Sequence, residues 1–399
     1  MINISKENRI FGGVEGLINA EYALFFGFIV LYLKSCGYPE SAIGIMTSAT
    51  LVLSIISMPL IGYISENYVT VKKILIFCML VMLLCASVIP LIAQHYGILF
   101  FLYSVISCTG RSVPSIADIY ITKLAKRRSG LDYAFVRGIG SACYALTALG
   151  AGKVAAVFGL NSLFVMHGFA IILGLACLSQ AEDVPISDQI EKEGREGFLP
   201  VLKGLSRNGR FVVVALASAI VHTGASAHGT YLSINLINIG GTSTDFGLAI
   251  FVSALSECPV LWNYHHLYRR FSLNKLLLFA FVIYTLRMAV MLTTRNIYVM
   301  LLVHGLQSLS YAIFLPSFMR YVQMVVPENV GATATLLGTS IYAGIGGFCG
   351  SLFGGFLLEN MGYEGLYIFC FACCTLGTVV FGLDQFLRRS SPKPDELLL

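Results

Sequence analysis

Seven ionisable side chains fall inside long apolar stretches of the sequence, and they are the first candidates for chemistry. They are Glu15, Glu21, Arg111, Asp118, Arg137, Glu257 and Arg287. An ionised group costs several kcal/mol when it leaves water without a partner, so each must face a polar cavity or an opposite charge. Each is therefore a candidate for solute binding, ion coupling or gating, and a purely structural ion pair is the alternative.

Three of these residues form one constellation. Arg111 and Asp118 are seven residues apart, nearly two turns of an α-helix, and are expected to project from one helical face into a central cavity. Asp118 then has two possible basic partners, Arg111 on its own helix and Arg137 on the next. A solute with several hydroxyl groups could enter this network in place of water. The alternative is a static clamp between two helices.

Histidine and glutamine side chains add further hydrogen-bonding groups. His304, Gln307 and Tyr311 share one helical face at spacings of three and seven residues, and His228 lies in the middle of another apolar stretch. We regard His228, His304 and Gln307 as candidate solute-binding residues. Hydrogen-bonded packing is the alternative for the histidines, and it is the role expected of His167.

Long apolar segments must carry these residues. The chain is 57% hydrophobic and 12% charged, whereas an ordinary soluble domain is about 25% charged. Residues 74–93 include no charge at all, and about 20 such residues suffice to cross a bilayer as a helix. Twelve segments of this kind are predicted, at 11–33, 42–64, 74–94, 97–121, 134–157, 160–179, 211–235, 246–267, 275–293, 297–320, 332–357 and 363–384. The sequence therefore predicts an all-α membrane protein with twelve transmembrane helices and the lipid bilayer as a partner.

A hydrophilic stretch at 180–210 separates six of these segments from the other six. We accordingly expect an N-terminal six-helix bundle at 1–179, a cytoplasmic linker at 180–210, a C-terminal bundle at 211–385 and a cytoplasmic tail at 386–399. The first apolar segment includes two glutamates and no small-residue cleavage pattern, so it is interpreted as a spanning helix and not as a signal peptide.

The basic residues predict the orientation. Lys and Arg are retained on the cytoplasmic side of a membrane. With the amino terminus inside, most of the 26 Lys and Arg lie on the cytoplasmic side, and only Lys34, Lys153 and Arg295 lie on the opposite side. Both termini are therefore expected in the cytoplasm, and the expected location is a cell membrane of the bacterial inner or plasma type.

Several functional classes find no support in the sequence. The net charge of +5 arises from basic residues in short loops beside helix ends, so no nucleic-acid partner is expected. No H-E-x-x-H, G-x-S-x-G or G-x-x-x-x-G-K-[ST] motif occurs, so we expect no enzyme and no cofactor. Cys370 and Cys373 form a C-x-x-C without a second pair or nearby histidines, so no metal site is expected.

The loop after the second segment carries a family resemblance. Gly62 is followed four residues later by Glu66, and then by the basic pair Lys72 and Lys73. This pattern resembles the signature loop of the major facilitator superfamily, with Glu for the usual Asp and two additional residues before the lysines. The resemblance implies a gating loop that latches helices at the cytoplasmic face. The two halves also echo each other at an offset of about 200 residues, which is typical of two six-helix pseudo-repeats.

A narrower resemblance covers most of the chain, which is similar to the branch that contains lactose permease and related sugar and nucleoside proton symporters. It rests on the stretches around Asp118 and Arg137, around Glu257, and from Arg287 to Arg320. The resemblance implies that Asp118 and Arg137 are the charged pair that binds sugar hydroxyls, and that Glu257 is the acid at the sugar site. Arg287 matches the intramembrane arginine of that branch.

The same overlay leaves the coupling residue open. It puts Gln307 on the coupling histidine of the branch and Ser310 on its proton-carrying glutamate, so that proton site is absent here. The carrier must then be sought among Glu21, Asp118 and Glu257. We favour Glu21, because Arg137 and Arg287 are expected to hold the other two acids ionised, and Glu257 is the next candidate. Arg287 is also counted among the coupling candidates.

These patterns together predict a secondary active transporter that moves a small polar solute, a sugar or a nucleoside, by alternating access. Proton symport is the expected coupling, and the chain is expected to act as a monomer. The alternative is a proton-coupled efflux antiporter for sugars or drugs. Arg111 favours the alternative, since drug antiporters carry an arginine in that helix, but the Gly-Pro-x-x-Gly-Gly pattern of their next helix is absent.

Overall fold

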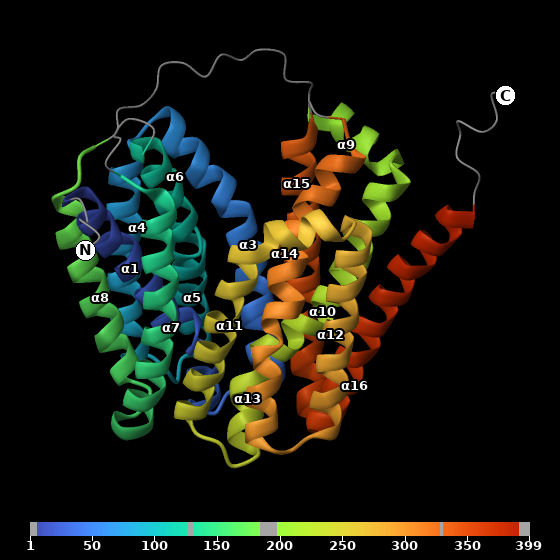
Figure 1. Cartoon of the computed structure of the whole chain (residues 1–399). Helices are drawn as coiled ribbons and strands as arrows, with labels where there is room; N and C mark the ends of the chain where they lie inside the picture. The colour runs from blue at the N-terminus through green and yellow to red at the C-terminus, as the bar shows by residue number, and fades with distance from the viewer. Residues whose placement is uncertain (1–5, 126–130, 184–197, 328–329, 391–399) are drawn as a thin grey trace. The chain divides into compact units, whose positions relative to one another are not determined.

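Helices account for nearly all of the computed structural model, which describes residues 6–125, 131–183, 198–327 and 330–390 (Figure 1). No strand occurs in these ranges. The all-α prediction is therefore confirmed. The chain divides into two compact units, Met1–Glu191 with Tyr231–Leu255, and Lys192–Thr230 with Ser256–Leu399, and each is described by itself.

The first unit begins with six apolar segments, several of them interrupted. They comprise α1 (Lys6–Phe26), α2 (Ile29–Ser35), α3 (Glu40–Asn67), α4 (Val71–Val88) with the 3₁₀ turn η1 (Ile89–Leu91), α5 (Tyr96–Gly110), α6 (Val113–Ala125), α7 (Tyr133–Phe158) and α8 (Ser162–Ser179). The first predicted span is thus divided between α1 and α2, and the fourth between α5 and α6. Arg111 lies in the second of these interruptions.

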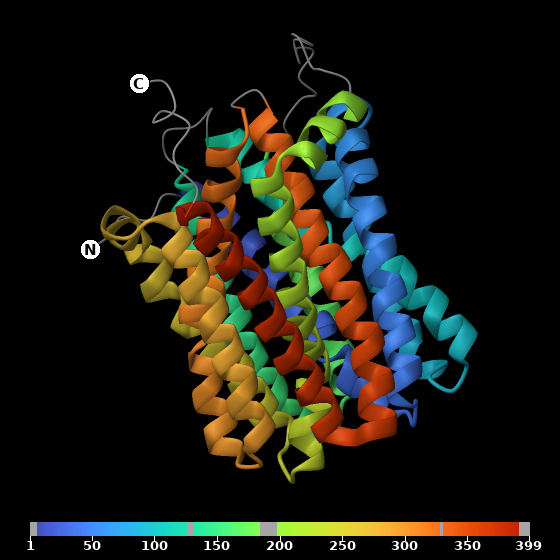
Figure 2. The same ribbon diagram turned by 90° about the vertical axis from the view of Figure 1, so that its right-hand side faces the viewer.

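The second unit also consists of apolar helices, several of them interrupted. It holds α9 (Phe198–Arg207), α12 (Leu273–Thr293), α13 (Ile297–Gly305), α14 (Gln307–Val325), α15 (Gly331–Thr339), the π-helical turn η3 (Ser340–Ile345) and α16 (Gly346–Ser390). The boundary between the units divides α10 (Gly209–Asn238) and α11 (Ser243–Arg270). Figure 2 shows α10 beside α16 on both sides of Gly362, where the backbone of α16 breaks. Gly346 approaches Ala219 before this break, and Gly377 approaches Val221 after it.

Eleven segments of the described chain are long and apolar enough to span a membrane. The last, Thr333–Arg388, has 56 residues, which as one helix would be roughly 84 Å long against a hydrocarbon core of about 30 Å. The backbone breaks at Gly362, whose φ of 66° ends one helix and starts the next. This segment therefore supplies two spans, and the structure agrees with twelve.

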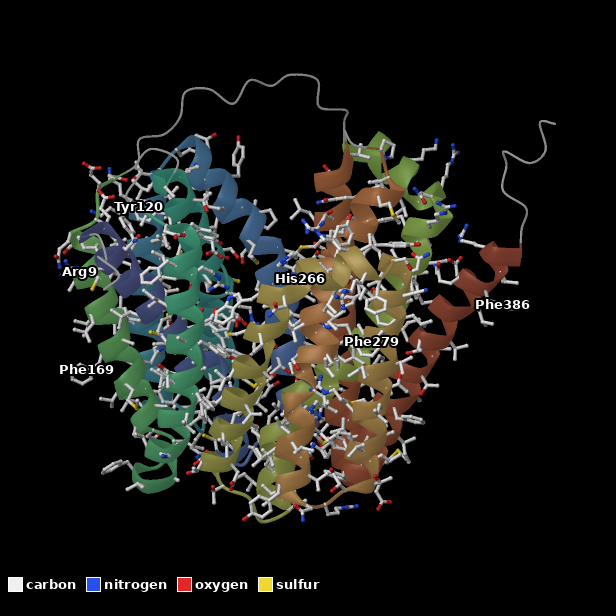
Figure 3. All side chains as sticks on the ribbon, in the orientation of Figure 1. Arg9, Tyr120, Phe169, His266, Phe279 and Phe386 are labelled. Carbon is white, nitrogen blue, oxygen red and sulfur yellow. The ribbon has the colours of Figure 1, made fainter. Side chains whose placement is uncertain are left out.

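Large apolar side chains project away from the helices, as expected for surfaces that meet lipid. In Figure 3, Phe169 of α8 and Phe386 of α16 extend outward, and they are 64% and 66% exposed. Burying this surface in lipid is favourable, whereas leaving it in water is not. The chain is a multi-pass membrane protein.

The predicted domain boundaries do not coincide with the two units, because residues 231–255 group with the N-terminal helices. Gly152 of α7 and Gly247 of α11 bring their backbones together, with Ser243 Oγ donating to the Gly152 carbonyl at 3.0 Å. Residues 184–197 of the linker and 391–399 of the tail lie outside the described residues. The division at 1–179, 180–210, 211–385 and 386–399 stays a prediction.

Candidate functional site

A polar cluster joins three helices of the first unit. Arg137 of α7 donates from Nη1 to Glu15 Oε1 of α1 at 3.0 Å, and its Nε lies 3.6 Å from Asp118 Oδ1 of α6. Asn19 Nδ2 donates to Glu15 Oε1 at 3.0 Å, and Tyr133 Oη donates to Asp118 Oδ1 at 3.1 Å. We call these five residues the Arg137 cluster. It holds two carboxylates and one guanidinium.

The Arg137 cluster runs from the protein interior to an accessible surface. The side chain of Glu15 is fully buried, whereas those of Asp118 and Arg137 are 29% and 40% exposed. Within the described residues, Glu15 Oε2 has no hydrogen-bond partner. Arg137 therefore presents an anchored cation beside a partly exposed acid, an arrangement that can bind a solute with both donors and acceptors.

Two local features place Glu15 against α7. Glu15 and Asn19 are four residues apart and so lie on one face of α1. Gly140 lets α7 approach that face closely: a Cβ atom at this position would lie 2.7 Å from Asn19 Nδ2 and 2.8 Å from Glu15 Cγ. The missing side chain of Gly140 makes room for the buried end of the cluster.

Arg111 lies apart from this cluster, contrary to the sequence-based expectation. The helix is interrupted at Arg111 and Ser112, so the spacing to Asp118 does not follow one regular helix. The guanidinium of Arg111 stacks 4.7 Å from the Phe26 ring centroid and hydrogen-bonds with Tyr22 and Tyr103. In the described part of the chain, the basic partner of Asp118 is Arg137 and not Arg111.

Glu21 faces a different neighbour. Its side chain is fully buried, and its Oε2 lies 3.5 Å from Nδ1 of His167 on α8, which also lies 3.1 Å from the Glu21 carbonyl oxygen. His167 is 1% exposed and packs against Phe25, so it is a core residue as expected. Neither carboxylate oxygen of Glu21 has a hydrogen-bond partner among the described residues. The pair is buried between α1 and α8, beside the Phe25 ring.

The second unit contains another polar cluster, formed by Glu257, Arg287, Gln307 and Ser310. Arg287 is 2% exposed, and its Nη1 donates to Gln307 Oε1 and, at 2.8 Å, to Ser310 Oγ. Glu257 hydrogen-bonds with the Gln307 side chain and lies within the electrostatic reach of Arg287. The expected neighbourhood of Glu257 and Arg287 is present, with Gln307 between them.

A pair of stacked histidines lies near Arg287. The rings of His228 and His304 are 5.1 Å apart at an angle of 24°, and His228 Nδ1 is 2.8 Å from the Tyr367 hydroxyl. The Nε2 atoms of both histidines lack a hydrogen-bond partner in the described ranges. No group of three or more His, Cys, Asp or Glu among those residues could hold a metal ion.

The predicted gating loop is described in part. Lys72 Nζ donates to the carbonyl oxygens of Ser179 at 3.4 Å and Ala181 at 2.6 Å, so it holds the end of α8. Lys73 is exposed. Gly62 and the Glu66 side chain lie outside what the structure describes in detail.

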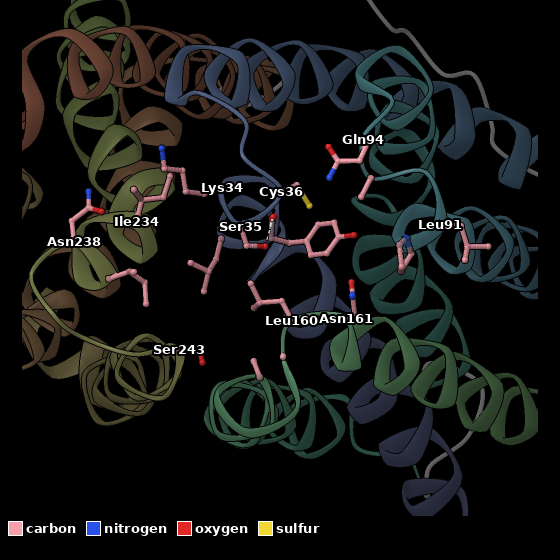
Figure 4. A pocket seen from close by; sticks show the side chains of 17 residues that line it. Lys34, Ser35, Cys36, Leu91, Gln94, Leu160, Asn161, Ile234, Asn238 and Ser243 are labelled. Atoms are coloured by element: carbon pink, nitrogen blue, oxygen red, sulfur yellow. Dashed lines mark hydrogen bonds between the residues drawn. The ribbon is translucent and has the colours of Figure 1, made fainter.

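The first unit also contains a cavity that the sequence did not predict. It has a volume of about 790 Å³ and lies where α2, η1, the end of α7, the end of α10 and the start of α11 meet (Figure 4). Lys34, Gln94 and Asn161 contribute polar groups, but Lys34 is already paired with Glu40 at 2.7 Å. Turn and loop residues line much of the cavity, so no helical periodicity could have indicated it.

Sequence reasoning identified most of the charged residues but not all of their partners. Asn19, Tyr133 and Tyr367 were missed because uncharged polar residues are common in transmembrane helices and carry no distinct signal alone. The spacing of four between Glu15 and Asn19 was the one available signal, since it puts an amide beside a buried acid.

An all-helical membrane fold with twelve spans and a polar cluster in each unit defines a class, that of the major facilitator transporters. The chain belongs to the MFS_1 like family, whose model matches residues 17–369. It is a transporter and not an enzyme.

The chain is similar to the maltose permease of Geobacillus stearothermophilus, with 23% identity over 378 residues that cover 94% of each chain. Its fold is similar to that of the nucleoside transporter NupG, with a TM-score of 0.81, 12% identity and coverage of 98% of this chain and 100% of that one. The D-xylose-proton symporter also matches, with a TM-score of 0.69, 13% identity and coverage of 94% and 96%. The family match confirms the expected superfamily, and the structural similarities show the same fold.

Proposed function

We propose that this protein is a secondary active transporter that takes up a sugar or a nucleoside together with protons by alternating access. The observation that carries the proposal is the Arg137 cluster, in which a buried carboxylate anchors a partly exposed guanidinium beside a second acid. Paired donors and acceptors of this kind match vicinal hydroxyl groups. The names of the relatives, a maltose permease, a nucleoside transporter and a D-xylose-proton symporter, point to the same solute classes.

The second unit supports the proposal with further groups for the solute. Gln307, His228 and His304 offer donors and acceptors around the fixed charge of Arg287. The carboxylate of Glu257 is available in this unit to accept a hydrogen bond from the solute or to bind a proton. A solute that bonds to these groups would exchange hydrogen bonds with water for hydrogen bonds with the protein at little net cost.

We also propose that the protein acts as a monomer in a cell membrane, with the linker and both termini in the cytoplasm. The distribution of Lys and Arg supports this orientation. Efflux of sugars or drugs is the second candidate, and the observation that favours it is Arg111 in the interrupted fourth span, beside Tyr22 and Tyr103.

Reconstituted vesicles test both candidates. Purified protein in liposomes would be given radiolabelled maltose, D-xylose or uridine under an inward proton gradient, with protein-free liposomes and a proton ionophore as controls. Accumulation of one solute above its equilibrium level, abolished by the ionophore, is the expected result. Gradient-driven loss of preloaded solute would instead establish efflux, and no movement of any of the three would overturn the proposal.

A further inference from the structure

The Arg137 cluster holds more negative than positive charge. Its two carboxylates, Glu15 and Asp118, both contact the one guanidinium of Arg137. The other ionisable groups that face it do not supply a second cation. Tyr133 lies beside Asp118 and within electrostatic reach of Glu15, and Asn19 is neutral. Two ionised acids on one arginine would leave one net negative charge in a cluster whose inner end is the fully buried Glu15, with its Oε2 unpartnered among the described residues.

Within the described residues, the side chains that α7 and α8 place against Gly12, Gly13 and Gly16 of α1 are uncharged. The thiols of Cys143 on α7 and Cys177 on α8 face Gly16 and Gly13 of α1. The imidazole of His167 on α8 faces Glu21. Because the missing positive charge is not provided by the described residues, a bound proton is the simplest way to balance the cluster.

We propose that Glu15 and Asp118 share the coupling proton of this transporter across Arg137. This inference rests on the proposed proton symport and assigns its site. A proton from the solution outside enters at the partly exposed Asp118 and forms an O–H bond on one carboxylate of the pair. It leaves to the cytoplasmic solution when the solute departs, and no other covalent bond changes.

The geometry favours this pair over Glu21. The side chain of Asp118 is 29% exposed and that of Arg137 is 40% exposed, so water and solute can both reach the cluster. Glu21 and its neighbour His167 are 0% and 1% exposed and lie among aromatic rings. A carrier must exchange protons with water on each cycle, and a solute must be able to affect it.

The arrangement also links the proton to the solute. With one proton bound, the cluster is neutral, and the guanidinium can turn a donor toward solute hydroxyls while Glu15 keeps it anchored. Without the proton, the two acids compete for the same guanidinium, and the donor is less available to a solute. Solute affinity therefore depends on occupancy of the proton site.

Two variants test the pair in the vesicles described above. Glu15→Gln mimics the protonated acid, and Asp118→Asn leaves a one-to-one pair of Glu15 and Arg137 that needs no proton. We expect Glu15→Gln to retain solute exchange between equal concentrations on both sides, yet to lose gradient-driven accumulation at least tenfold. In both variants, solute binding should lose its pH dependence. Glu21→Gln, which changes a buried acid of the same helix in the same way, tests the rival carrier that the sequence favours, and accumulation by this variant would exclude Glu21 as the coupling site.

The outcomes separate the two proposals. If the wild-type protein exchanges solute but never accumulates it with protons, the proposed symport itself is wrong. If the wild type accumulates solute and Glu15→Gln does so equally, with an unchanged pH profile of binding, only the shared proton site is overturned. Loss of accumulation in Glu21→Gln alone would move the site to Glu21. Should Glu15→Gln fail to fold, the pH profile of Asp118→Asn decides, and an unchanged profile there overturns the inference.

Discussion

Gly140→Ala is expected to disrupt the Arg137 cluster, although the substitution adds only one methyl group. The new Cβ atom would lie 2.7 Å from Asn19 Nδ2 and 2.8 Å from Glu15 Cγ, well inside van der Waals contact. Overpacking of this kind costs about 1–3 kcal/mol. Displacing Glu15 from Arg137 would also weaken a charged hydrogen bond, and it would free the guanidinium from the anchor that holds it toward the solute, so solute affinity should fall as well.

The same helix offers a matched control. Gly138 has no neighbour within 4 Å of an added Cβ, so Gly138→Ala meets open space. Both glycines are in α7, so the gain in helix propensity of about 0.5–1 kcal/mol is common to the two variants and cancels in their comparison. Gly140→Ala should therefore be less stable than Gly138→Ala by roughly 1–3 kcal/mol.

Thermal unfolding with a thiol-reactive fluorescent dye measures this difference, since buried cysteines such as Cys78, Cys370 and Cys374 become accessible as the helices separate. Solute binding would be measured on the same samples. Equal unfolding midpoints and equal affinities for the two variants would refute the close approach of α1 and α7 on which the site depends.

Three further outcomes are expected. Arg137→Ala should reduce solute binding at least tenfold, because it leaves two acids without their cation. Breaking a buried ion pair costs about 3–5 kcal/mol, and the exposure of Arg137 lowers this cost to roughly 1–3 kcal/mol. Wild-type affinity in a binding assay would contradict this role. A single cysteine placed in the 180–210 linker should react with membrane-impermeant reagents only from the cytoplasmic side, and labelling from outside would reverse the proposed orientation. Gly152→Ala should lower the unfolding midpoint, because its Cβ would lie 2.4 Å from the Ser243 carbonyl oxygen. Gly150→Ala is the control, since its Cβ would have no neighbour within 4 Å. Similar midpoints for the two variants would argue against the tight contact of α7 and α11.

The spanning helices follow from the sequence because the cost of exposing a backbone to lipid is local. Each span must satisfy its own hydrogen bonds, so about 20 apolar residues in a row are enough to predict a helix. The prediction of 275–293, for instance, differs by two residues from α12. The interruptions at Phe28, Arg111 and Leu306 were not predicted, because the neighbouring helices determine where a helix can break at low cost.

The sequence alone also shows that seven charged residues fall inside apolar spans, and the cost of burying a charge requires that each have a partner or a polar cavity. It did not determine the partners. Arg137 was expected beside Asp118, but the structure adds Glu15, which is 122 residues away. It also pairs Glu21 with His167 across 146 residues and gives Arg111 two tyrosines in place of an acid. The need for a partner is fixed by the local free energy of burying a charge, whereas its identity depends on which helix faces pack together, and close contacts such as that at Gly140 decide this only in the tertiary structure.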